Sequence, residues 1–232
     1  MEWDSSFFRK RIGRLRPDPD SSTDLDAVAR LDRSSFDCVF VELDAAAAHL
    51  LDRWSSLGAQ VVDVRLELSA RVGDEVAHTS SSLVEVIGKW SSSDREAATA
   101  LAEDLSTWSR FARDPAFADS AARMYRNWIG MAFSGEHETL AWRDQGRIAG
   151  ILTSKLEPDA VWLELLDVND GYRGRGIGLA LVNAFLARAV ATKRPVARVR
   201  TQLRNTGAVR TYERAGFGLS RATLVLHWWP RS

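Results

Sequence analysis

The chain has 232 residues, of which 45% are hydrophobic and 27% charged, a composition that is ordinary for a globular protein with one large core or two small ones. Its 31 basic and 31 acidic side chains balance, which argues against nucleic acid as the main partner, because proteins that bind phosphate backbones usually carry a basic excess. A single cysteine, Cys38, excludes a disulfide within the chain and a metal centre built from several thiolates.

The N-terminal residues contain no apolar run of signal-peptide length, and no segment approaches the roughly 20 apolar residues that cross a bilayer. We therefore expect a cytoplasmic protein without a membrane partner. The four histidines show no metal-ligand spacing, so we expect no metal site; they are His49, His78, His137 and His227.

The first part of the chain alternates strand and helix signals, which is typical of an α/β subdomain with crossover connections. The expected elements are a strand at 7–15, a helix at 23–34, a strand at 38–43, a helix at 45–58 and a strand at 59–68. Serine triplets at 80–82 and 91–93 then flank a short apolar run. They predict a boundary between an N-terminal α/β subdomain at 1–90 and a second domain at 91–232.

The second domain begins with helices and continues with strands. Ser93 and Glu96 form a capping-box pattern at a helix start, and Gln145-Gly146 indicates a hairpin turn. The expected elements are helices at 94–108 and 118–135 around a loop at 109–117, strands at 139–144, 147–156 and 160–168, a helix at 177–193, a strand at 195–203, a helix at 205–215 and a strand at 222–229. This order predicts a mixed α/β sheet, whose last strand either closes the sheet or pairs across a homodimer.

A glycine cluster, GYRGRGIG at 171–178, separates a predicted strand from a predicted helix. A dinucleotide-binding fold requires G-x-G-x-x-G and a later acidic residue, and a P-loop requires G-x-x-x-x-G-K-[ST]; neither matches. A turn without a ligand would place glycines at a helix start at a cost of up to about 1 kcal/mol each. We expect the backbone amides of the cluster to hold a pyrophosphate at a helix N-terminus. The residues concerned are Arg173, Gly174, Arg175, Gly176, Ile177, Gly178 and Leu179.

The distribution of charge fits an anionic ligand at this cluster. Residues 1–135 carry a net charge of −6, whereas residues 136–232, which include the glycines, carry +6. The side chains of Arg173 and Arg175 either add charge to the anion site or are ordinary solvated residues.

Two motifs resemble those of the GCN5-related N-acetyltransferases (GNAT). Residues 173–178 are similar to the pattern R/Q-x-x-G-x-G/A, and residues 205–217 are similar to N-x-x-A-x-x-x-Y-x-x-x-G-F. This resemblance covers roughly residues 95–232. It implies a mostly antiparallel sheet flanked by helices, acetyl-CoA as co-substrate, and a strand at 160–168 that splays from the strand at 195–203.

Three further stretches resemble the TDP-fucosamine acetyltransferases, which acetylate a nucleotide-linked amino sugar in bacterial surface-polysaccharide assembly. They are WDSSFF at 3–8, LGAQVVDVRLEL at 57–68 and SRFARDPAFADSAARMYRNWI at 109–129. The resemblance implies a small-molecule amine acceptor, specifically a nucleotide-linked amino sugar.

The GNAT resemblance assigns roles to three positions. The backbone N–H near Val168 would bind the developing oxyanion, Tyr212 would give a proton to the leaving thiolate, and Asn205 would contact the pantetheine arm. Asn205 and Tyr212 lie seven residues apart and so share one helix face. A phenol with a pKa near 10 is protonated at neutral pH, as such an acid must be.

The general base and the acceptor wall are less defined by the sequence. Asp63 is the candidate base, because it alternates with apolar neighbours and matches an acidic position of the amino-sugar family, and Glu67 and Glu164 are its rivals. Arg110 could pair with a diphosphate, and Phe111 or Trp128 could stack on a sugar or base. Packing and a surface ion pair are the alternatives for these three residues.

Other functions compatible with the sequence are acetylation of an antibiotic, a polyamine, an amino acid or a protein N-terminus. An acyl-CoA-binding sensor is a further alternative. It is disfavoured because a sensor needs no thiolate acid, yet both Asn205 and Tyr212 are present.

Overall fold

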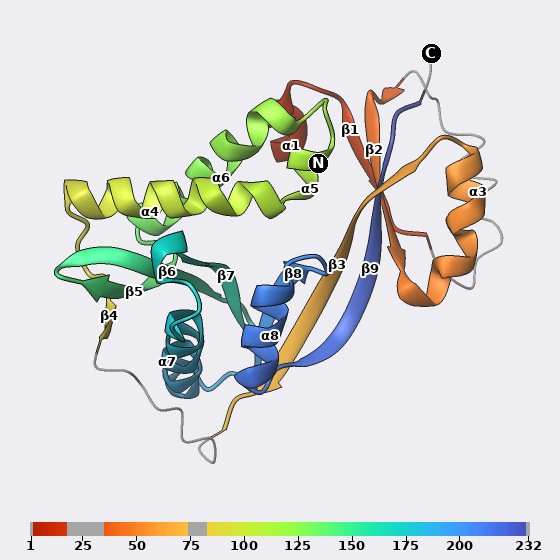
Figure 1. Cartoon of the computed structure of the whole chain (residues 1–232). Helices are drawn as coiled ribbons and strands as arrows, with labels where there is room; N and C mark the ends of the chain where they lie inside the picture. Colours follow the sequence, from red (N-terminus) through yellow and green to blue (C-terminus); the bar gives the residue numbers. More distant parts are fainter. Residues whose placement is uncertain (1, 18–34, 74–82, 231–232) are drawn as a thin grey trace.

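The computed structural model describes residues 2–17, 35–73 and 83–230, and within them nine strands form one sheet (Figure 1). The strand order is β1-β2-β9-β3-β8-β7-β6-β5-β4. The strands are β1 Ile12–Leu15, β2 Cys38–Asp44, β3 Gln60–Arg71, β4 Val84–Val86, β5 Glu138–Asp144, β6 Arg147–Leu156, β7 Val161–Val168, β8 Val196–Gln202 and β9 Gly218–Trp228. Only β1-β2 and β7-β8 pair in parallel, which confirms the expected mixed, mostly antiparallel sheet.

Helices cover both faces of this sheet. In Figure 1, α4, α5 and α6 lie on one side of β5–β7, α7 and α8 lie on the other, and α3 flanks the β1-β2 end. The helical elements are α1 Glu2–Phe8, η2 Ala45–Leu50, α3 Leu51–Ser56, α4 Ser92–Leu105, η3 Ser106–Trp108, α5 Arg110–Arg113, α6 Ala118–Phe133, η4 Asp170–Tyr172, α7 Ile177–Ala191 and α8 Thr206–Arg214. The flanking helices predicted within the described residues are therefore confirmed, and their bounds differ from the predicted ones by at most three residues.

Three hydrophobic clusters fill the space between these layers. The first lies between the sheet and α7 and α8, around Leu181 and Val199. The second lies under α1, α4 and α6, around Phe117 and Ile129. The third joins β2 and β9 to η2 and α3, around Trp54. Each face of the sheet is therefore buried where a helix covers it.

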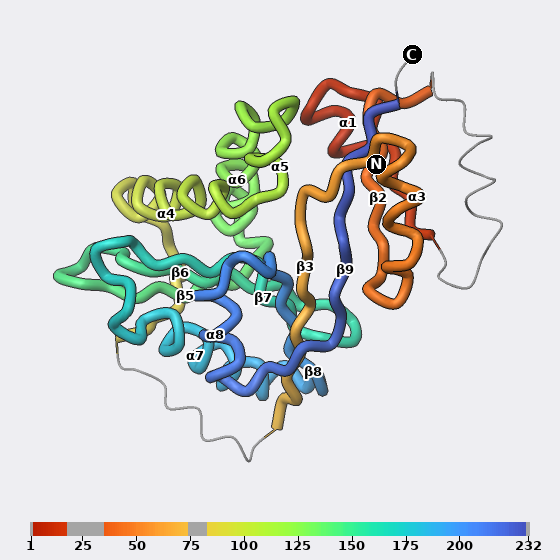
Figure 2. Tube along the Cα trace, turned by 45° about the vertical axis from the view of Figure 1, so that its right-hand side comes forward, coloured from red at the N-terminus to blue at the C-terminus, as the bar shows by residue number. Residues whose placement is uncertain are grey.

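Strands β3 and β9 run side by side through the middle of the molecule (Figure 2). β3 is hydrogen-bonded to β9 on one side and to β8 on the other. Strands that precede residue 90 in the sequence and strands that follow it therefore belong to one continuous sheet, which runs across the predicted boundary between 1–90 and 91–232.

The N-terminal strand expected at 7–15 is wrong in its first half. Residues 2–8 form α1, and only Ile12–Leu15 are extended. Arg9 adopts a φ of +52°, and the Ser5 hydroxyl accepts a hydrogen bond from Ile12 N at 3.0 Å, so the chain turns back after the helix. Phe8 then packs on Phe117, with ring centroids 4.6 Å apart. The helix expected at 23–34 lies outside the described residues.

Two local details also differ from expectation. The capping box at α4 is formed by Ser91 and Asp94, two residues earlier than predicted, because Asp94 is held there by an ion pair with Arg143 at 2.6 Å. The expected loop at 109–117 contains the short helix α5, which begins where the Ser109 hydroxyl accepts a hydrogen bond from Phe111 N at 3.0 Å.

The hairpin between β5 and β6 forms as predicted. Gln145 and Gly146 adopt φ values of +47° and +81°, the left-handed pair that a two-residue hairpin turn requires. On β6, a Cβ added to Gly150 would lie 3.1 Å from Ile177 Cγ2, 3.2 Å from Leu181 Cδ1 and 3.3 Å from Val168 Cγ2. The missing side chain lets α7 approach the sheet closely.

We expect Gly150→Ala to lower the free energy of unfolding by about 1–3 kcal/mol, because the added methyl group overpacks the contact between β6 and α7. Gly130→Ala is the matched control. A Cβ at Gly130, within α6, meets nothing within 4 Å, so this change should raise stability by about 0.5–1 kcal/mol. Denaturant titration of both variants measures the difference, and equal shifts of the same sign would contradict the proposed close packing.

Candidate active site

The sheet opens between β7 and β8. These strands pair only over Val161–Leu163, after which β7 continues with β6 as far as Val168 and β8 continues with β3 as far as Gln202. The cause is a bulge at Glu164, where the β6-β7 register shifts. Leu163 therefore packs toward α7, whereas Leu165, two residues later, packs toward α4 and α6. The opening leaves a gap at the carboxyl ends of both strands.

The glycine cluster lies beside this gap, between η4 and α7. Gly174 and Gly176 adopt φ values of +76° and +81°, which favour glycine because it lacks a Cβ. No side chain caps α7 at Gly176. The first amides of this helix, from Ile177 onward, have no intrahelical acceptor and lie at the positive end of the helix dipole.

A cavity of about 360 Å³ lies against these amides. The cluster forms one wall, α8 forms another through Thr211, and Val168 of β7 contributes to the lining. A Cβ added to Gly178 would lie 3.6 Å from Thr211 Cγ2, an ordinary van der Waals contact, so the start of α7 lies close to α8. Together, the glycine cluster at 171–178 and the N-terminus of α7 form a concave surface of backbone amides, which we call the glycine cradle. Its position at a helix N-terminus fits a pyrophosphate.

The two arginines of the cluster brace the loop itself. Arg173 donates to the carbonyl of Val168 at 2.8 Å and forms ion pairs with Asp167, Asp104 and Asp170. Asp104 belongs to α4, so this guanidinium ties the loop to the opposite layer. Arg175 donates to the carbonyl of Gly171 and stacks over a tyrosine ring. The backbone amides are thus left as the anion-binding groups of the cluster.

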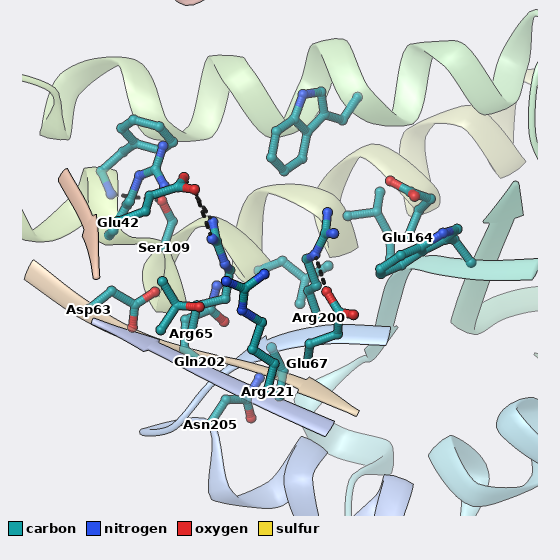
Figure 3. A pocket seen from close by; sticks show the side chains of 18 of the residues that line it. Glu42, Asp63, Arg65, Glu67, Ser109, Glu164, Arg200, Gln202, Asn205 and Arg221 are labelled. Carbon is teal, nitrogen blue, oxygen red and sulfur yellow. Dashed lines mark hydrogen bonds and ion pairs between the residues drawn. The ribbon is translucent and has the colours of Figure 1, made fainter. Parts of the chain in front are cut away.

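A second cavity, of about 570 Å³, lies on the α4–α6 face of the sheet (Figure 3). Its floor consists of alternate strand residues, since period-2 alternation places every second side chain on one face. On β3, Asp63, Arg65 and Glu67 point into the cavity; Figure 3 shows these residues with Glu42 of β2 and Arg221 of β9. The intervening apolar residues of β3 enter the core.

The two cavities meet in the gap between β7 and β8. Leu105 of α4, Leu166 of β7 and Asn205 line both of them. A molecule in the glycine cradle and a second molecule in the larger cavity can therefore reach one another at this point. This junction is where a group transfer between two ligands could occur.

α8 begins at the junction, where Asn205 is its N-cap, and it carries Tyr212 to the wall of the larger cavity. The Asn205 side-chain oxygen caps the helix by accepting from Ala208 N at 3.2 Å, which leaves its NH₂ group to donate elsewhere. Tyr212 is 4% exposed and lines the larger cavity. Burial, reinforced by the negative charge of Asp167, raises the pKa of this phenol. It is therefore protonated throughout the neutral range.

Of the three candidate bases, Asp63 has the most suitable surroundings. Burial raises the pKa of its carboxyl group, although Arg204, the amide of Val64 and Arg110 oppose this. No basic side chain in the described ranges forms an ion pair with it. Glu67 is paired with Arg200 at 3.0 Å, and Glu164 is an exposed bulge residue.

The predicted acceptor residues come from the layer above the floor. Arg110 and Phe111 of α5 and Trp128 of α6 all line the larger cavity. Phe111 is also a core residue, 5% exposed, whereas Trp128 is half-buried and packs on Tyr125 with ring centroids 4.9 Å apart. A second indole, Trp162 of β7, lines the same cavity.

Sequence reasoning missed a group of arginines around Glu42. This carboxylate is 3% exposed and pairs with Arg16 at 2.8 Å, Arg65 at 3.2 Å and Arg14 at 3.5 Å. Burial alone would raise its pKa, but hydrogen bonds from Arg65 and Arg16 outweigh burial and hold the pKa at about 2. The alternation on each strand was readable, but which strands become neighbours was not.

A further missed residue is Arg204, between β8 and α8. Its guanidinium donates to the backbone carbonyls of Thr107, Trp108 and Ser109 at 3.0–3.2 Å. It thereby fixes the turn that precedes α5 to the strand end that carries Asn205. The signal would have been hard to find, since the partners are backbone atoms almost 100 residues away.

Comparisons with known proteins agree with this geometry. The model of the acetyltransferase (GNAT) family matches residues 100–217. The spore coat polysaccharide biosynthesis protein SpsD of Bacillus subtilis (strain 168) is 30% identical over 139 residues, which are 59% of this chain and 48% of that protein. The chain thus spans about half the length of this curated relative.

Solved structures show the same fold. The GCN5-related N-acetyltransferase from Sphaerobacter thermophilus matches with a TM-score of 0.61 at 17% identity, covering 84% of this chain and 60% of that one. The GCN5-related N-acetyltransferase from Kribbella flavida matches with a TM-score of 0.57 at 18% identity, covering 94% and 79%. Among the described residues, no helix has both the length and the apolar character needed to cross a membrane.

The Glu42 network predicts a pH-dependent stability. The pKa of this carboxyl group is about 2 in the folded chain against a reference value of 4.5, so its contribution is full above pH 4.5 and is lost as the pH falls toward 2. We expect Glu42→Gln to lower the free energy of unfolding at pH 7 by up to about 3 kcal/mol, with the gap closing in acid. Glu103→Gln, which breaks only a surface pair with Arg126, should cost less than about 1 kcal/mol. A gap that stays constant from pH 7 to pH 2 would contradict this account.

Proposed function

The chain belongs to the acetyltransferase (GNAT) family, and from this premise we propose that it transfers the acetyl group of acetyl-CoA to the amine of a nucleotide-linked amino sugar. The observation that carries the proposal is the junction of the two cavities at Leu105, Leu166 and Asn205. One cavity has the glycine cradle of an acyl-CoA site. The other has the carboxylate of Asp63 together with arginines gathered around Glu42, which suits an acceptor that carries both an amine and an anionic group.

The residues present fit coenzyme A. The amides from Arg173 to Leu179 would hold its pyrophosphate, because Gly174 and Gly176 bring the backbone close and the α7 N-terminus is uncapped. The NH₂ group of Asn205 would donate to the pantetheine arm. When bound, acetyl-CoA supplies a thioester whose carbonyl carbon accepts the amine. The backbone N–H near Val168, at the end of the splayed strand, would bind the carbonyl oxygen.

Asp63 would act as the general base. An alkylammonium must lose a proton before its nitrogen can attack, and the raised pKa of Asp63 makes this carboxylate a stronger base than an ordinary aspartate. Asp63 takes this proton, directly or through a water molecule, and later releases it to solvent. The new carbon–nitrogen bond then forms as the carbon–sulfur bond breaks.

Tyr212 would act as the general acid. Its phenol gives its proton to the departing sulfur, and the second proton lost by the amine nitrogen restores the phenol through solvent. Burial suits this role, because the raised pKa keeps the phenol protonated until it is needed. Overall, one alkylammonium and one acetyl-CoA give one amide, one coenzyme A thiol and one proton released to solvent.

The sugar component of the proposal has two supports. The relative that is 30% identical is named for polysaccharide biosynthesis in the spore coat. The acceptor cavity also contains two indoles, of Trp128 and Trp162, and aromatic faces pack well against the apolar faces of sugar rings. A nucleotide-linked sugar adds a diphosphate, for which the arginines provide partners.

The direct test is release of thiol from acetyl-CoA in the presence of a panel of acceptors. The panel consists of TDP- and UDP-linked amino sugars, the matching free amino sugars, polyamines, aminoglycosides, amino acids and short peptides. We expect turnover with one or a few nucleotide-linked amino sugars. Turnover confined to the other amines would contradict the proposed acceptor but leave the acetyltransferase activity standing. Binding of coenzyme A without turnover on any amine would contradict the activity and favour an acyl-CoA sensor.

The acid and base roles predict distinct pH profiles. An ordinary aspartate has a pKa near 4, and the pKa of Asp63 is raised above this value. On the acid side of the pH profile, kcat/KM should therefore fall as the pH drops through this raised pKa, because Asp63 becomes protonated; this fall is the acid limb of the profile. We expect Asp63→Asn to lower kcat/KM by about 10²–10⁴-fold and to remove this limb. Tyr212→Phe should lower kcat at least 10-fold and keep the limb, since it removes only the acid.

Glu67→Gln is the control for the choice of base, because Glu67 lies two residues along the same strand and faces the same cavity. Its acid limb should match that of the unaltered chain. An acid limb that vanishes in Glu67→Gln and persists in Asp63→Asn would transfer the base role to Glu67.

A further inference from the structure

Four arginines face one carboxylate at the end of the larger cavity that lies away from the glycine cradle. We call Arg14, Arg16, Arg65, Arg110 and Glu42 the arginine cluster; all five line the cavity. Glu42 is ionised, because its arginine partners hold its pKa at about 2. The five residues sum to a formal charge of +3, which Asp4, a further carboxylate that lines the cavity and acts on Arg110, reduces to +2.

Among the described residues, Arg110 is the member of the cluster that forms no ion pair within 4 Å, although the charges of Glu42 and Asp4 act on it. Its guanidinium lies over the rings of Phe40 and Phe111, 4.6 Å and 4.5 Å from their centroids. Its Nε atom is buried and has no hydrogen-bond partner within the described ranges. Burial, and then the charge of Arg65, lower its pKa to about 10, so it is charged at neutral pH. A charged guanidinium held over two aromatic rings beside a cavity is arranged to receive an anion.

The position of the cluster fixes which part of an acceptor it can reach. Arg65 is the cross-strand partner of Gln202, close to the junction at Asn205. Glu42 lies on β2, three strands from β8 in the sheet, which corresponds to about 14 Å at about 4.8 Å per strand. Figure 3 shows the Arg65 side chain extending toward Glu42 and away from Asn205. The anion site therefore begins next to the acetyl-transfer point and extends away from it.

We propose that the arginine cluster is a diphosphate subsite that binds the linkage between sugar and nucleoside, with Arg110 as its specificity-determining residue. This inference rests on the proposed function. An amine on the sugar ring lies at the junction while the diphosphate lies on the arginines, so the distance between the two sites selects nucleotide-linked sugars over free ones. Glu42 orients three of the guanidinium groups and prevents them from repelling one another in the empty cavity.

The first experiment measures binding of uridine diphosphate, thymidine diphosphate and inorganic pyrophosphate by calorimetry. The protein is first saturated with coenzyme A, so that the glycine cradle, itself an anion site, cannot contribute. We expect saturable binding that weakens as salt is raised and that weakens at least 10-fold in Arg110→Gln. Arg188→Gln, which removes a guanidinium paired with Glu138 on another face, is the matched control and should bind as the unaltered chain does.

A second variant protects the test against misfolding. Arg14→Gln removes a more exposed member of the cluster and should weaken diphosphate binding in the same direction. With an amino-sugar nucleotide and its free amino sugar as paired substrates, both variants should reduce the ratio of the two kcat/KM values at least 10-fold. A ratio that is unchanged in both variants would overturn the subsite.

The outcomes separate the two proposals. Diphosphate binding that depends on Arg110, without acetylation of any nucleotide-linked sugar, would leave the subsite standing and overturn the proposed acceptor. If the protein acetylates such a sugar but binds diphosphate equally well in the Arg110 and Arg14 variants, the proposed acceptor stands and the subsite is overturned. No diphosphate binding to the unaltered chain would make the cluster a structural ion network and overturn the inference.

Discussion

The bulge at Glu164 is the constraint on which the rest of the site depends. A parallel pair such as β7-β8 would ordinarily continue until one strand ends, since unpaired backbone groups inside a protein are costly. One extra residue in β7 turns Leu165 to the opposite layer and separates this strand from β8. The strand ends left unpaired form the wall of a passage between two cavities. The positions of Val168, Asn205 and Tyr212 follow from that separation.

Electrostatics within the molecule is local rather than global. The formal net charge is zero, yet three guanidinium groups gather around the single buried carboxylate of Glu42. At the glycine cradle, three carboxylates surround one guanidinium group instead. Arg173 forms ion pairs with Asp104, Asp167 and Asp170. An arginine within a motif is thus engaged internally, while arginines on unremarkable strands face the cavity. Charge composition therefore carries little information about where an anion binds.

The elements predicted correctly were those with signals confined to a few residues. The hairpin at Gln145-Gly146 requires positive φ at two positions, and α7 follows directly from its glycines. The α1 helix was missed because its stability comes from Phe8 packing on a residue more than 100 positions away. The arginine cluster was missed for the same reason. Alternation shows that Arg65 and Glu42 each face a cavity, but only the strand order makes it the same cavity.

The central position of β3 has a consequence for how the chain can be divided. This strand carries Asp63 and Arg65 into the larger cavity and is also hydrogen-bonded to both β8 and β9. A fragment beginning after residue 90 would lose β3 together with β1, β2 and β4, so that β9 would have no neighbour and β5 and β8 would become open sheet edges that invite association with other chains. The parts of the chain before and after residue 90 therefore complete one another's sheet, and recombination at that point would divide the sheet itself.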